Sequence, residues 1–199
     1  SDMSYYEYHY WQRLSLTDMI KDNIYDHAGT VTGRSRIIKG INYLTMKKEE
    51  RGNITSVFEK GKIIEMDIVS LEPRILCNHN AMDNFNDVYT HTKKILNLNS
   101  LSRDMIKLGL LAIIYGAGQS TVKKLSGIDG NTMKKIKDYY KIEILTKYLK
   151  DNYEKNGLIR NMYNRPIYSK NSLVNHFIQS SAADCAQLAF YQFLKNKNK

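Results

Sequence analysis

Cysteine, proline and tryptophan are scarce in this chain of 199 residues, which has two cysteines, two prolines and one tryptophan. Cys77 and Cys185 stand far apart and fit neither a zinc-binding nor a redox spacing, so we read them as buried thiols in a reducing compartment. No apolar run approaches the roughly 20 residues of a membrane-spanning helix, and no secretory leader is recognisable. The expected location is therefore the cytoplasm, with no membrane partner.

Acidic residues are also in the minority, with 20 Asp and Glu against 30 Lys and Arg and a formal net charge of +10. Such a balance favours a partner rich in phosphates, although ribosomal and merely soluble proteins share it. The five histidines have no common ligand spacing, so a structural metal is not expected. The abundance of Lys, Asn, Ile and Tyr is typical of AT-rich coding and indicates a phage or another AT-rich genome.

The periodicity predicts a chain of mixed class, with few strands and many helices. Apolar residues between Tyr5 and His27 recur at helical spacing and predict one or two amphipathic helices. Two β-type stretches, Ile54–Phe58 and Lys62–Val69, flank a turn at Gly61. Further helices are expected from Leu71 with Ser70 as cap, at 84–96, at 102–115 with Ser102 as cap, as two or three short helices within 119–156, and at 173–194 after a turn at 163–166.

Asp67 follows an apolar run that reads as a central strand with this carboxylate at its exposed end. A single aspartate of this kind is usually structural. Enzymes that transfer phosphoryl groups with two metal ions need at least two carboxylates and other oxygen ligands. The main-chain carbonyl of Ile68 would offer one such oxygen.

Arg103, Lys107 and Tyr115 follow the spacing R-x3-K-x7-Y-G on an otherwise apolar segment. At 3.6 residues per turn they lie within about one third of the helix circumference. One reading is the solvated face of an amphipathic helix. The other is a clamp for a triphosphate, in which Lys107 also protonates the departing pyrophosphate.

Four segments together resemble motifs of the family A DNA polymerases, the DNA polymerase I family. Residues 67–74 (DIVSLEPR) resemble motif A, and residues 103–116 resemble motif B. Thr32-Gly33-Arg34 resembles the T-G-R segment that precedes motif A, and residues 175–184 (NHFIQSSAAD) resemble the family's N-x-x-x-Q-G-x-A-A-D. The four occur in the family's order.

The resemblance implies an α+β fold, in which a partial palm of antiparallel strands is joined to mainly α-helical fingers. The expected parts are a helical lead-in at 1–29, palm with motif A at 30–100, fingers with motif B at 101–166 and a palm-side helix at 167–199. The implied catalytic residues are Asp67 and Lys107, with Asp67 and Ile68 as ligands of two Mg²⁺ ions. Nucleotide contacts are implied for Glu72, Arg103, Lys107, Leu111 and Tyr115, and DNA contacts for Arg34, Asn175 and Gln179.

Glu72 is implied to exclude a ribose 2′-hydroxyl, which argues against a single-subunit RNA polymerase. Leu111 stands where the family carries Phe or Tyr, and Ser180 where it carries Gly. The His-Asp-Glu segment that bears the second catalytic aspartate does not occur in this sequence. The expected function is template-directed addition of deoxynucleotides to a primer 3′-hydroxyl, by one subunit of a split enzyme or by an excised fragment. A complementary C-terminal polypeptide would complete it. The alternative is a DNA-binding accessory protein that lost catalysis.

Overall fold

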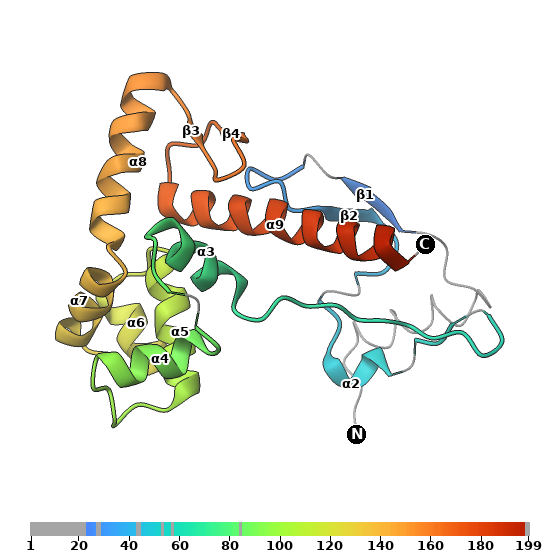
Figure 1. The fold of residues 1–199 in the computed structure, drawn as a ribbon, viewed down its shortest axis with the longest axis horizontal. Coiled ribbons are helices and arrows are strands. Elements are labelled where there is room, and N and C mark those ends of the chain that lie inside the picture. The colour runs from blue at the N-terminus through green and yellow to red at the C-terminus, as the bar shows by residue number, and fades with distance from the viewer. Residues whose placement is uncertain are drawn as a thin grey trace. The chain divides into compact units, whose positions relative to one another are not determined.

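The computed structural model describes residues 23–26, 29–42, 45–52, 54–56, 58–83 and 85–197. They belong to two units: the N-terminal unit, up to residue 30 and over 35–67, and the helical unit, 31–34 and 68–197. Helices dominate, with two small antiparallel sheets (Figure 1). The predicted mixture of helix and strand is confirmed at this level. Neither sheet carries Asp67.

The N-terminal unit contains an antiparallel strand pair and a short helix. Strands β1 (Ile24–Asp26) and β2 (Arg36–Lys39) pair with each other, and helix α2 covers Lys48–Arg51. The side chain of Asn23 donates to the Ile41 carbonyl and accepts from the Ile41 N–H, both at 2.8 Å.

The helix predicted from Tyr5 to His27 is therefore wrong over the residues of β1. There the backbone hydrogen bonds are satisfied across the strand pair rather than within a helical turn. The remainder of that prediction, apart from Asn23, lies outside the described residues.

The strands predicted at 54–58 and 62–69 do not form in the described part of the chain. The turn between them is present, because the Gly61 N–H donates to the Phe58 carbonyl at 2.9 Å. A strand requires a hydrogen-bonded neighbour, and the sheets of the described chain offer none to this segment. Asp67 therefore lies in irregular, exposed chain rather than at the end of a strand.

The helical unit has α5 at its centre. Helix α5 packs against α4, α6 and α7, whereas α9 packs against α3, α8 and β3 (Figure 1). Leu76, Ile106, Leu110, Tyr140 and Ile178 are fully buried in one continuous core. The elements in chain order are α3 (Leu71–His79), α4 (Val88–Ile95), α5 (Arg103–Ile114), α6 (Gln119–Ser126), α7 (Gly130–Tyr139), α8 (Ile142–Asn156), β3 (Ile159–Arg160), β4 (Pro166–Ile167) and α9 (Leu173–Lys197).

Local signals predicted several of these helices well. Ser102 caps α5, since its hydroxyl accepts the Met105 N–H at 3.1 Å, and the segment 119–156 forms three helices as expected. Helix α3 begins at Leu71 as predicted, but Ser70 has a positive φ of 55° and makes no side-chain cap. The turn at 163–166 is present, although the short strands β3 and β4 beside it were not predicted.

The predicted start of a helix at Asn84 is wrong, because α4 begins at Val88. Asp87 fixes this start, since its carboxylate accepts the Tyr89 N–H at 3.1 Å and the Thr90 hydroxyl at 2.6 Å. Of the two free cysteines, Cys77 is buried, and burial raises the pKa of its thiol to about 11. Cys185 is only half-buried, so the prediction of two buried thiols holds for Cys77 alone.

Candidate functional site

Three segments that are distant in the sequence meet at the carboxylate of Glu72, in the first turn of α3. Its Oε1 accepts a hydrogen bond from Arg34 Nη2 at 2.6 Å and a longer one from the Tyr115 hydroxyl at 3.4 Å. These partners lie 38 and 43 residues away along the chain. Burial raises the pKa of Tyr115, and the negative charge of Glu72 raises it further. We call Arg34, Glu72 and Tyr115 the Glu72 cluster.

A buried polar network ties the β3–β4 hairpin to α9. Arg165 pairs with Asp184, through Nε at 3.0 Å from Oδ2 and through Nη2 on Oδ1. The side-chain nitrogen of Asn161 donates to Asp184 and to the Ser180 hydroxyl, both at 2.7 Å. Asn161, Ser180 and Asp184 are all buried. Ser180, at the position where the resembled family has glycine, thus has a structural partner here.

The T-G-R segment packs against this network. Gly33 has a φ of 70°, a region that favours glycine, and a Cβ there would lie 1.9 Å from Arg165 Nη1. The neighbouring Thr32 is buried. The backbone just before Arg34 therefore lies directly against the Arg165 guanidinium.

The predicted motif B residues lie on the side of α5 that faces away from the core. Arg103, Lys107 and Tyr115 are exposed and Leu111 is half-buried, while Ile106 and Leu110 are fully buried. Within the described chain, Lys107 makes no ion pair and no hydrogen bond through its ammonium group. Its charge is therefore available to an external anion.

Arg103 is engaged by a residue that sequence reasoning missed. Its Nε lies 2.6 Å from Asp87 Oδ2 and its Nη2 3.3 Å from Oδ1, and the guanidinium carbon lies 5.2 Å from the centroid of the Tyr89 ring. The hydrogen bond from Arg103 holds the pKa of Asp87 at about 2. Asp87 was not predicted as a site residue because the helix was expected to begin at Asn84. That start would place Asp87 inside the helix rather than at its N-cap.

Asn175 and Gln179 lie one turn apart on α9, and both are half-buried. Among the described residues, Asn175 Oδ1 is a buried acceptor without a hydrogen-bond donor. Asn175 and Tyr115 line a hollow of about 220 Å³, together with Lys150 and Lys170. The two lysines that line the hollow favour an anion, and the unsatisfied Asn175 acceptor favours a ligand that also carries a hydrogen-bond donor. Sequence reasoning missed both lysines, because Lys150 is one of nine lysines in 119–156 and Lys170 belongs to no motif.

The implied pair of magnesium ions does not fit the described residues. Asp67 is exposed at the end of the N-terminal unit, and Ile68 begins the helical unit. Glu65 is paired with Arg51 at 2.5 Å, and Asp184 is paired with Arg165. Over the described ranges, no three His, Cys, Asp or Glu side chains come together as metal ligands. The described residues by themselves therefore offer no site for the two ions.

Comparison with protein-family models and with curated proteins finds no match for this chain. None of the helices in the described ranges is long and apolar enough to cross a membrane.

Proposed function

We propose that the chain is the nucleotide- and primer-binding part of a DNA-directed DNA polymerase, which adds deoxynucleotides to a primer 3′-hydroxyl. The observation that carries this proposal is the Glu72 cluster. The motif resemblance says nothing about distances, yet one residue from each of three matched segments lies within hydrogen-bonding distance at a single carboxylate. If residues 103–115 were only the solvated face of an amphipathic helix, there would be no reason for Tyr115 to share a carboxylate with Arg34.

The roles in the proposal follow from the chemistry of the exposed groups. Lys107 contacts the triphosphate and donates a proton to the departing pyrophosphate, because its ammonium group, on the first turns of α5, has no partner among the described residues. Glu72, held by Arg34 and Tyr115, lies under the sugar and leaves no room for a 2′-hydroxyl. Arg103 and Leu111 complete the nucleotide contacts on the same side of α5.

Arg34, Asn175 and Gln179 contact the primer–template DNA in this proposal, supported by the net positive charge of the chain. The two magnesium ions belong to the complete enzyme. A complementary C-terminal polypeptide supplies the carboxylate that the described residues lack, because Asp67 alone cannot hold the two ions.

A DNA-binding accessory protein without catalysis is the second candidate function. Two observations favour it: Arg103 is held by Asp87, and the other acidic candidates Glu65 and Asp184 are paired with arginines. Binding of DNA alone does not need Lys107. The dependence of nucleotide binding on Lys107 therefore separates the two candidates.

The proposed function predicts salt-sensitive binding of DNA and lysine-dependent binding of nucleotide. Affinity for primer–template, measured by fluorescence anisotropy, should fall steeply between about 50 and 200 mM salt because bound counterions are released. Lys107→Ala should weaken binding of a deoxynucleoside triphosphate to this complex about tenfold. Lys134→Ala, on the exposed surface of α7, is the matched control and should bind as wild type. Equal nucleotide affinity of the Lys107 and Lys134 variants would contradict the polymerase proposal and favour the accessory protein.

Asp87→Asn should increase nucleotide affinity, by up to about fivefold, because it releases Arg103 from its ion pair. Asparagine caps helices as well as aspartate does, so α4 should keep its start. Isothermal titration with a deoxynucleoside triphosphate measures the change. Asp104→Asn removes the more distant acid, 3.5 Å from Arg103 Nη1, and should have a smaller effect. An affinity of Asp87→Asn at or below that of wild type would show that Arg103 is not restrained by Asp87.

A further inference from the structure

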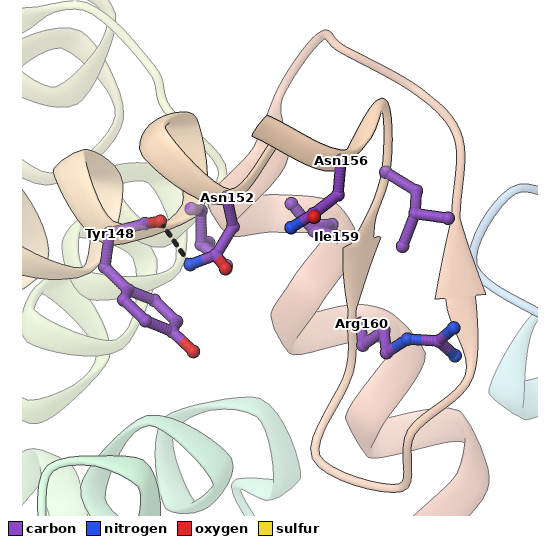
Figure 2. A pocket seen from close by; sticks show the side chains of 7 residues that line it. Tyr148, Asn152, Asn156, Ile159 and Arg160 are labelled. Carbon is purple, nitrogen blue, oxygen red and sulfur yellow. Dashed lines mark hydrogen bonds between the residues drawn. The ribbon is translucent and has the colours of Figure 1, made fainter. Parts of the chain in front are cut away.

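The end of helix α8 presents a row of polar side chains to a hollow of about 320 Å³ (Figure 2). Tyr148, Asn152 and Asn156 are spaced four residues apart and therefore share one face of the helix. Gly157, with a φ of 69°, ends α8 and reverses the chain, so that Arg160 on β3 lines the same hollow.

The floor of this hollow is apolar and its rim is polar. Leu149 and Ile159 are each 1% exposed and belong to the core. The Tyr148 side chain, in contrast, is 56% exposed. A flat ligand with apolar faces and polar edges would match the apolar floor and the polar rim of the hollow.

The polar side chains of the rim keep hydrogen-bonding groups that are free to contact a ligand. Asn152 Nδ2 donates to the Tyr148 carbonyl at 2.7 Å (Figure 2), which sets the orientation of the amide and leaves Oδ1 to accept. Asn156 makes no side-chain hydrogen bond within the described part of the chain. Arg160 Nη1 donates to the Asn164 carbonyl at 3.0 Å, and the other N–H groups of this exposed guanidinium have no partner among the described residues and can bind an anion.

We propose that this hollow binds one unpaired base of a single-stranded nucleic acid. The base stacks on the Tyr148 ring, the amides of Asn152 and Asn156 bond to its edge, and Arg160 contacts the adjoining phosphate. Aromatic rings, side-chain amides and arginine are the groups that hold unpaired bases in proteins. The volume lies at the lower end of the roughly 300–1,000 Å³ of ligand pockets, which suits a single base. Only the identity of the strand, an unpaired template, rests on the proposed polymerase function.

The charges around Tyr148 determine on which side of its ring the phosphate of the bound nucleotide lies. Residues 119–160 contain ten Lys and Arg against five Asp and Glu, which is a local charge of +5. Tyr148 also lines a second hollow of about 440 Å³, nearer the start of α8, that includes Glu143 and Asp151. Because these carboxylates repel phosphate, the phosphate of the bound nucleotide lies on the Arg160 side.

The test is binding of a fluorescent hexathymidylate at low salt, with an oligonucleotide short enough to report one site. Tyr148→Ala should weaken binding about tenfold, whereas Tyr148→Phe, which keeps the ring, should bind as wild type. Asn156→Ala removes an amide with no internal role and should weaken binding less. Tyr191→Ala, at a tyrosine that is 58% exposed on α9, is the matched control and should have no effect. Equal affinity of the Tyr148→Ala and Tyr191→Ala variants would overturn the proposal.

A hexathymidylate that carries 5-iodouracil locates the contact directly. Photo-crosslinking should modify the peptide that contains Tyr148, and modification confined to other peptides would overturn the proposal. Displacement of the oligonucleotide by free thymidine monophosphate at equal concentration would identify a mononucleotide site and would also overturn it.

Failure of this site and failure of the proposed function give different results. Triphosphate binding is read from Lys107→Ala against its control Lys134→Ala, and oligonucleotide binding is read from Tyr148→Ala against its control Tyr191→Ala. If triphosphate binding ignores Lys107 but oligonucleotide binding still requires Tyr148, the polymerase proposal fails and the base site stands. If triphosphate binding requires Lys107 but oligonucleotide binding does not require Tyr148, the base site fails and the polymerase proposal stands.

Discussion

Replacing Arg165 by alanine is expected to lower the free energy of unfolding of the chain by about 3 kcal/mol. The reason is the partner left behind: Asp184 is 8% exposed, and the substitution removes the only cation that contacts it among the described residues. An uncompensated buried carboxylate costs more than the ion pair itself contributes. Urea unfolding followed by circular dichroism measures the change.

Arg103→Ala is the matched control for this experiment. It also removes an arginine–aspartate pair, but the side chains of Arg103 and Asp87 are 46% and 30% exposed. The expected loss is below about 1 kcal/mol, because water screens an exposed pair. Adding Asp184→Asn to Arg165→Ala should recover part of the stability by removing the buried charge. An Arg165→Ala variant as stable as the Arg103→Ala variant would contradict the importance assigned to this network.

The chain by itself is expected not to extend a primer when it is given magnesium and all four deoxynucleoside triphosphates. Chemistry with two metal ions needs at least two carboxylates at one place. Glu65, Glu72 and Asp184 are each paired with an arginine, which leaves Asp67 as the candidate ligand in the described part of motif A. The measurement is extension of a labelled primer by the chain alone, with an unrelated complete polymerase as the positive control.

Asp67→Asn guards this experiment against a contaminating polymerase. Extension that survives Asp67→Asn comes from a contaminant, whereas extension that disappears with it belongs to the chain. The second outcome would mean that Glu65 or Asp184 had left its arginine to bind metal, and the expectation of an incomplete site would be wrong. Mixing with a complementary polypeptide that carries the missing carboxylate should restore extension.

The helices of the helical unit were largely predictable from sequence, because their determinants are local. Ser102 and Gly116 frame α5, and the apolar period between them is helical. The segment 62–69 was mispredicted for the opposite reason. Its β-branched residues favour a strand, but a strand also depends on a neighbour, which the segment's own sequence does not specify.

The sequence alone could suggest candidate residues but not the contacts between them. The sequence named Arg34, Glu72 and Tyr115 through a family resemblance, and only the structure gives the hydrogen bonds between them. Asp87 and Arg165 were not predicted, because each acts through a partner 16 or 19 residues away. Such pairings follow from tertiary packing and have no local signature.

The contact between Gly33 and Arg165 makes residue 33 sensitive in two ways at once. A methyl group there would occupy the space of the guanidinium that neutralises Asp184, in addition to straining a left-handed backbone. In a screen of random variants, changes at Gly33 would therefore reduce the amount of folded protein before any change in DNA affinity could be measured. A screen scored only by DNA binding would count Gly33 as a contact residue, although its neighbour Arg34 carries the charge.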